Sequence, residues 1–232
     1  AKDALLAGKH VMCEKPLAST SKEARELAAL CKEKGLLGGV CYNLRFYPLI
    51  QQVKAMIAAG ELGEIFSVNG SYLQDWLFSQ KDYNWRVEGE ASATRAVADI
   101  GSHWLDMMEY VTGLRVERVC ADFATFYKTR YKPLNQVGTF EGKLTAPQQY
   151  QEGPVDTEDY AAVLLRFGGG AHGALNVSQV AAGRKNKLWF EINGSKQSVA
   201  WSGERPNELW LGNRDAPNGI LIKDPSLAAP EA

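Results

Sequence analysis

Apolar positions in the first part of the chain alternate between the short runs of buried strands and the wider spacing of a helix. Val11-Met12-Cys13 and residues 36–42 are apolar runs typical of buried strands. Between them, Thr20 with Glu23 indicates a capping box, and the apolar stripe that follows predicts a helix ending at Gly35. We therefore expect a β-α-β unit near the start of the chain.

Helical spacing returns twice further along. Pro48 occupies a favoured first-turn position and predicts a helix that runs to Gly60. Residues 97–112 place apolar side chains on one face of a second helix, with Asp99, His103 and Asp106 on the opposite face. Between these helices, residues 65–76 read as a strand and residues 77–92 show no clear period.

The rest of the chain has the pattern of a strand meander, with glycine and asparagine turn signals between apolar runs. Lys128–Pro154 is a long polar stretch that we interpret as a loop beside a site or a subunit contact. The expected fold is an α/β remnant followed by an α+β domain with a large, mostly antiparallel open sheet that carries helices on one face. The expected strands are Val116–Tyr127, Asp159–Phe167, Ala171–Gln179, Lys187–Ile192, Gln197–Trp201, Glu208–Leu211 and Ile220–Ile222.

Composition narrows the function without defining it. The 232 residues are 45% hydrophobic and carry a formal net charge of −1, so nothing favours nucleic acid as a partner. No apolar run is long enough to span a membrane. The four cysteines form no C-x-x-C pair, and we expect reduced core residues and no metal site. The corresponding location is cytoplasmic.

Three side chains suggest proton transfer. Asp99 and His103 are four residues apart, so one helical face can present both, and Lys15 follows the first strand. A histidine can exchange a proton near neutral pH, and a carboxylate can fix its tautomer. A lysine can stabilise an oxygen that becomes negative. Oxidation of an alcohol needs this chemistry together with a hydride acceptor, for which a nicotinamide cofactor, NAD or NADP, is suited.

In this order and spacing, several motifs of the chain resemble the glucose–fructose oxidoreductase / inositol dehydrogenase (Gfo/Idh/MocA) family. The family's nucleotide-binding domain begins with a G-x-G-x-x-G loop at a strand-to-helix turn, and the glycines from Gly168 lie between two strand-like runs instead. The resemblance therefore implies a fragment whose activity belongs to a longer parent protein. The motifs are Gly8–Leu17, Tyr42–Pro48, Asn84–Arg86, Asp99–His103 and Thr157–Tyr160.

The resemblance implies domains, roles and partners. Residues 1–41 would be the C-terminal part of a dinucleotide-binding Rossmann domain, and residues 42–232 an α+β substrate-binding and oligomerisation domain. His103 would be the acid/base, Asp99 would bind a sugar hydroxyl and tune His103, and Lys15 would reach the cofactor ribose and the reacting oxygen, often through a cis Lys-Pro bond. A dimer or tetramer would form through the open sheet. The expected cofactor contacts are Glu14, Lys15, Pro16, Asn43 and Arg86, and the expected substrate contacts are Trp76, Trp85, Arg86, Asp99 and His103.

The predicted activity is hydride transfer between NAD(P) and a secondary hydroxyl of a sugar, anhydrosugar or cyclitol. Two alternatives remain open: a catalytically silent sugar or dinucleotide sensor of the same fold, and an NAD-dependent glycosidase. Trp76 and Trp85 could equally be core residues, and Asp106 is more consistent with structural hydrogen bonding than with the site.

Overall fold

The computed structural model describes residues 1–89, 94–134 and 149–230, and it divides the chain into two units. The first unit is Ala1–Leu44 and the second is Arg45–Ala232. None of the helices in the described part of the chain is long and apolar enough to cross a membrane. The fold class expected from the sequence is confirmed in both units, which are described separately below.

The first unit contains a β-α-β arrangement. It consists of α1 (Lys2–Leu6), β1 (Val11–Cys13), α2 (Ser21–Glu33) and β2 (Gly38–Val40). The two strands pair in parallel, with Val11 opposite Gly38. The capping box at the start of α2 is present: the Thr20 hydroxyl accepts the Glu23 N–H at 3.2 Å, and the Glu23 carboxylate accepts the Thr20 N–H at 3.0 Å. The spacing of apolar residues and the capping box therefore predicted the β-α-β unit correctly.

The second unit carries the large sheet. Its helices are α3 (Pro48–Ala58) and α4 (Ser102–Thr112), and a π-helical turn, Val97–Gly101, leads directly into α4. Gly113 ends α4 in the left-handed conformation that glycine adopts without strain. The strands are β3 (Ile65–Leu73), β4 (Val116–Ala124), β5 (Thr129–Pro133), β6 (Tyr150–Pro154), β7 (Tyr160–Phe167), β8 (His172–Ser178), β9 (Lys187–Gly194), β10 (Ser198–Ser202), β11 (Glu208–Gly212) and β12 (Gly219–Ile222).

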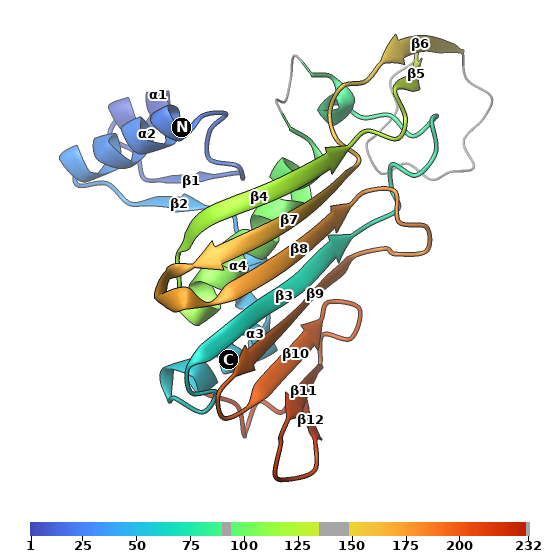
Figure 1. Ribbon diagram of the computed structural model, residues 1–232. Coiled ribbons are helices and arrows are strands. Elements are labelled where there is room, and N and C mark those ends of the chain that lie inside the picture. Colours follow the sequence, from blue (N-terminus) through green and yellow to red (C-terminus); the bar gives the residue numbers. More distant parts are fainter. Residues whose placement is uncertain (90–93, 135–148, 231–232) are drawn as a thin grey trace. The chain divides into compact units, whose positions relative to one another are not determined.

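Among the described residues, eight strands form one sheet in the order β12-β11-β10-β9-β3-β8-β7-β4. Every neighbouring pair is antiparallel except β3 and β8, which run in parallel from the pair Ser67 and His172 to the pair Leu73 and Ser178. The carboxyl ends of β3 and β8 therefore lie side by side at one edge of the sheet (Figure 1).

Helices α3 and α4 lie on one face of this sheet, and within the described part of the second unit no helix covers the other face, which we call the open face (Figure 1). Trp104 of α4 is fully buried against the sheet, and its indole N–H donates to the carbonyl of Trp189 in β9 at 2.9 Å. Gly70 of β3 makes this approach possible, because a Cβ there would overlap the Trp104 ring and the β9 backbone. The core thus lies between α4 and the centre of the sheet.

Three expectations need correction. Lys128–Pro154 is not only a loop, because β5 and β6 pair there as an antiparallel ribbon with Arg130 fully buried. The polar sequence of these two strands gave no apolar pattern by which they could be predicted. Residues 135–148 of this stretch lie outside the described residues. The cysteines form no disulfide, but they are not core residues: Cys120 is exposed on β4, and the other three are half-buried. His103, expected on the polar face of its helix opposite the apolar side chains, is nevertheless buried, with only 9% of its surface exposed.

Candidate active site

The first unit presents Lys15 and Asn43 at the carboxyl edge of its two strands. Lys15 follows β1, and Asn43 opens the short 3-10 turn after β2. The Cys41 N–H donates to the Cys13 carbonyl at 2.9 Å, which keeps the two strand ends together. The Lys15–Pro16 peptide bond is cis, as the resemblance implies. Ligands of parallel sheets bind at such edges, so this arrangement suits a cofactor contact.

Asp99 and His103 lie on consecutive helical turns of the second unit. Asp99 is in the π-helical turn, and His103 is in the first turn of α4. The start of this helix is held by Glu158, whose carboxylate accepts the N–H groups of Arg95 and Val97 at 2.9 Å. A negative charge is favourable at a helix N-terminus, where backbone N–H groups lack helical partners. Glu158 therefore fixes the segment that carries both expected catalytic residues.

The Asp99 carboxylate contacts two donors from other parts of the chain. Its Oδ1 is 3.2 Å from Nε of Arg86, and its Oδ2 accepts a hydrogen bond from Nε2 of Gln179 at 2.8 Å. Arg86 is itself oriented by Asn84, whose Oδ1 accepts from Nη1 at 3.1 Å. Two of the residues expected at the site, Asp99 and Arg86, are thus in direct contact.

His103 packs beside Tyr72 of β3. The two rings meet edge to face with centroids 6.4 Å apart. The Tyr72 hydroxyl donates to Oδ1 of Asn186 at 2.7 Å. Burial and the nearby charge of Asp99 raise the pKa of Tyr72, so its hydroxyl stays protonated at neutral pH. Tyr72 is therefore an uncharged side chain, ordered by its hydrogen bond to Asn186, that packs beside the polar cluster formed by Asp99 and His103.

The tryptophans expected at the site differ in their surroundings. Trp85 is 52% exposed, and the guanidinium of Arg86 lies 4.5 Å from its ring centroid. An exposed, cation-bearing ring is available to a ligand. Trp76 is half-buried and packs against the small apolar cluster of Leu77, Val87 and Val155. Its packing role is evident from these contacts, whereas Trp85 keeps a free face.

Asp106, on the turn after His103, forms a bidentate ion pair with Arg45. The Arg45 guanidinium also lies over the ring of Tyr110, 4.6 Å from its centroid. Asp106 therefore holds the start of the second unit against α4, in agreement with the structural interpretation of this residue.

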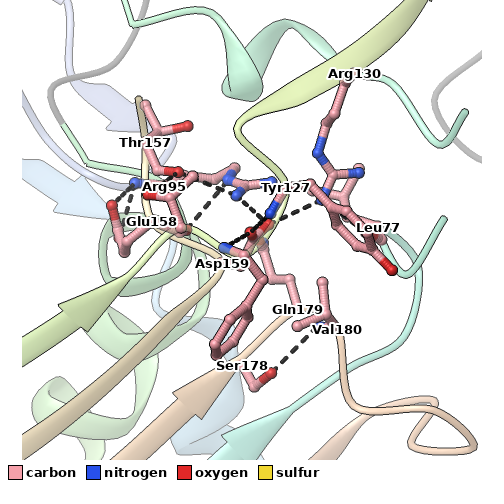
Figure 2. Close-up of polar contacts among 12 residues, drawn as sticks. Leu77, Arg95, Tyr127, Arg130, Thr157, Glu158, Asp159, Ser178, Gln179 and Val180 are labelled. Carbon is pink, nitrogen blue, oxygen red and sulfur yellow. Dashed lines mark hydrogen bonds and ion pairs between the residues drawn. The ribbon is translucent and has the colours of Figure 1, made fainter. Parts of the chain in front are cut away.

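A cluster of buried charged side chains forms around Asp159 (Figure 2). Asp159, Arg95 and Arg130 have completely buried side chains, and Oδ1 of Asp159 pairs with both guanidinium groups. Its Oδ2 accepts the backbone N–H groups of Phe126 at 2.7 Å and Tyr127 at 3.1 Å. We call Asp159, Arg95 and Arg130 the ionic cluster. Nη1 of Arg95 and Nε of Arg130 find no acceptor among the described residues, so the shared carboxylate is the main compensation for the two buried charges.

The ionic cluster connects the loop after β3 to the segment that leads into the π-helical turn and α4. Nη1 of Arg130 donates to the carbonyls of Ser79 and Asp82, and Nη2 donates to the carbonyl of Leu77. This loop leads into Trp85 and Arg86. Arg95 belongs to the segment that precedes the π-helical turn. One buried carboxylate, Asp159, therefore orders the chain on both sides of Asp99.

Several of these residues were not identified from the sequence. Gln179 appeared to be the end of a strand, and Tyr72 an ordinary strand residue. Glu158 lies in Thr157–Tyr160, one of the motifs of the resemblance, but the sequence assigns it no role. Arg95 and Arg130 had no signal of their own, because a buried ion pair has no periodic pattern. Gln179 could not be predicted as a site residue without the pairing of β3 with β8, because this pairing brings Gln179 beside the loop after β3.

The residues present fit a dinucleotide in part. Glu14, Pro16 and Asn43 are exposed at the edge that also carries Lys15, as a cofactor contact requires. No three His, Cys, Asp or Glu side chains lie together as metal ligands would within residues 1–89, 94–134 and 149–230. Gly168–Gly170 forms the turn between β7 and β8, so it is not a phosphate-binding loop at a helix start.

Comparison with models of known protein families gives two matches along the chain. Residues 50–200 match the GFO/IDH/MocA C-terminal domain, and residues 1–42 match the oxidoreductase family with an NAD-binding Rossmann fold. The first match alone covers more than half of the chain. The chain therefore belongs to the GFO/IDH/MocA oxidoreductase family, and the resemblance drawn from its motifs is confirmed.

The similar proteins include a levoglucosan dehydrogenase and an inositol dehydrogenase homolog. The chain is 34% identical over 204 residues to levoglucosan dehydrogenase of Pseudarthrobacter phenanthrenivorans, covering 88% of this chain and 52% of that protein. A levoglucosan dehydrogenase complex with NADH and L-sorbose matches with a TM-score of 0.84 at 31% identity, covering 96% of this chain and 57% of that one.

A similar match is an inositol dehydrogenase homolog from Azotobacter vinelandii complexed with NADH and myo-inositol. Its TM-score is 0.81 at 29% identity, covering 99% of this chain and 54% of that one. The chain thus spans about half the length of these relatives.

Proposed function

We propose that the protein containing this chain is an NAD(P)-dependent oxidoreductase that transfers hydride between the cofactor and a secondary hydroxyl of a sugar, anhydrosugar or cyclitol. The observation that carries the proposal is the cluster in which Arg86 and Gln179 hold the Asp99 carboxylate on the helix of His103. Family membership and the dehydrogenase relatives support it.

Each residue has a distinct role in this proposal. His103 takes the proton of the reacting hydroxyl, because imidazole is the side chain most often used as a general acid or base, and it lies beside Tyr72 on the helical turn after Asp99. Asp99 accepts a hydrogen bond from a substrate hydroxyl, and Arg86 and Trp85 contact the sugar from the loop after β3. The role proposed for Lys15, in the first unit, is to stabilise the oxygen as it becomes negative. The nicotinamide supplies the hydride acceptor when it is bound.

The activity can be tested with the full-length protein. Formation of NADH or NADPH is followed by absorbance with levoglucosan, L-sorbose, myo-inositol and other polyols. We expect turnover with at least one of them. Tight sugar or dinucleotide binding without turnover would indicate a sensor instead. Release of free sugar without net NADH would indicate a glycosidase.

The residue roles can be tested separately. We expect Lys15→Ala and His103→Ala each to lower turnover at least about a hundredfold, the usual range for acid–base groups. Lys9→Ala and His172→Ala are matched controls, because both side chains are exposed outside the cluster. Near-normal turnover in Lys15→Ala or His103→Ala would contradict the role of that residue.

We propose further that the protein is a homo-oligomer in which the open face of the sheet meets a second copy. This face has a hollow of about 450 Å³ whose apolar lining includes Ala162, Leu164, Ala174 and Trp189. Leu164 is 58% exposed, which is unfavourable for a leucine in water. Light scattering should show Leu164→Lys shifted toward monomer, whereas Leu227→Lys, at a site 83% exposed, should leave the mass unchanged. An unchanged mass for both would contradict this interface.

A further inference from the structure

Gln179 occupies a fixed position directly after β8. Its side chain and backbone are completely buried. Its N–H donates to the carbonyl of Asp159 at 3.0 Å, and its carbonyl accepts the N–H of Leu77 at 3.3 Å. These partners belong to the start of β7 and to the loop after β3. Two backbone hydrogen bonds therefore fix the main chain at Gln179 independently of its side chain (Figure 2).

The Gln179 side chain extends from this anchored position to Asp99. Its Nε2 donates to Oδ2 of Asp99 at 2.8 Å, while Arg86 lies 3.2 Å from Oδ1. A carboxylate can only accept, so the amide must present its NH₂ group to Asp99. The plane of the Asp99 carboxylate is thereby defined by two donors from different elements.

This arrangement has an energetic cost. Oε1 of Gln179 is buried and finds no donor among residues 1–89, 94–134 and 149–230. A buried acceptor without a donor is destabilising, and an apolar side chain of similar length would avoid this cost. Packing alone therefore does not explain a glutamine here, and the contact with Asp99 is what distinguishes the amide from a methionine.

We propose that Gln179 is a positioning residue for the reaction of the proposed function, on which this inference rests. Its neutral amide fixes the orientation of the Asp99 carboxylate and leaves that group as an acceptor for a substrate hydroxyl. A neutral donor suits this task, because a second carboxylate would repel Asp99 and a second cation would compete with the substrate for it.

Two substitutions in the full-length protein separate this role from a structural one. Gln179→Met keeps the length and removes the donor; we expect kcat/KM to fall about ten- to a hundredfold while the thermal midpoint stays the same or rises. Gln179→Glu retains a donor only while its carboxyl is protonated. The ratio of its kcat/KM to that of wild type should therefore be highest at acidic pH and fall as pH rises, to below the ratio for Gln179→Met, because the ionised carboxylate repels Asp99.

Gln197→Met is the matched control, because the Gln197 amide donates to Asn213 at 2.9 Å in a different part of the sheet. It should leave kcat/KM unchanged. The inference is overturned if Gln179→Met keeps kcat/KM within twofold of wild type, or if Gln179→Glu loses activity by the same factor at every pH. If Gln179→Met does not fold, the pH dependence of Gln179→Glu decides alone. A wild-type protein without turnover overturns the proposed function, and this inference with it.

Discussion

Replacing Asp159 by asparagine tests the ionic cluster directly. The substitution keeps the size of the side chain but leaves Arg95 and Arg130, both completely buried, without the carboxylate they share. An amide also has one acceptor oxygen, whereas Asp159 uses both of its oxygens. Removing one partner of a buried ion pair costs about 3–5 kcal/mol, since an uncompensated charge remains in the interior. We expect Asp159→Asn to lower the free energy of unfolding by that amount.

The measurement is urea unfolding at pH 7, followed by tryptophan fluorescence. The matched control is Glu204→Gln, which removes the exposed ion pair with Arg184 at 2.8 Å. Exposed pairs contribute about 0–1 kcal/mol, so this control should unfold almost as wild type does. In a protein of this size, about 3–5 kcal/mol corresponds to a thermal midpoint roughly 6–20 °C lower. Equal losses for Asp159→Asn and Glu204→Gln would refute the reasoning.

The pH dependence gives a second check. Burial opposes ionisation of Asp159, but the charge of Arg95, the Tyr127 N–H and Arg130 outweigh it and hold the pKa of Asp159 below its ordinary value of 3.8. A carboxyl group with a lowered folded-state pKa stabilises the protein above its ordinary pKa and loses this contribution as pH falls through the folded-state value. The difference between wild type and Asp159→Asn should therefore be constant from pH 7 to 5 and shrink only below about pH 4.

Two further changes test other contacts in the fold. Thr20→Ala removes the hydroxyl half of the capping box with Glu23 and should destabilise the protein by about 1 kcal/mol in urea unfolding; Thr20→Ser keeps the hydroxyl and should not. Gly70→Ala places a Cβ against Trp104 and should lower stability by about 1–3 kcal/mol, measured from the thermal midpoint. Gly153→Ala, where a Cβ meets open space, is its control. A smaller loss for Gly70→Ala than for Gly153→Ala would contradict the packing of α4.

Local signals in the sequence predicted the local structure well. Three such signals are the capping box at Thr20, the proline at the start of α3 and the glycine after α4, each of which acts within a few residues. In the structure, α2 and α3 begin and α4 stops where these residues indicate. Apart from β5 and β6, which were expected to be part of a loop, the strands after Gly113 were also expected near their observed positions. Alternation along a strand depends on its own two faces, so it is visible in one segment at a time.

Features that depend on partners distant in sequence were not predictable. No pattern in residues 65–73 indicates that β3 lies between β8 and β9, and Gln179 reaches Asp99 only because of that arrangement. The pairing of Arg130 with Asp159 is likewise invisible in the polar stretch that contains Arg130. The sequence predicted that Asp99 and Arg86 belong to the same site, but not that they form an ion pair. That contact depends on how the loop after β3 folds.

The central place of β3 also constrains how the chain can be built. Strand β3 ends at Leu73, but its neighbours β8 and β9 end at Ser178 and Gly194, so both of its edges stay unpaired until the ribosome has released more than a hundred further residues. Contacts of such large sequence separation form slowly, and an unpaired apolar strand can join another chain. Nascent chains of this protein should therefore depend on protection by chaperones until β9 emerges.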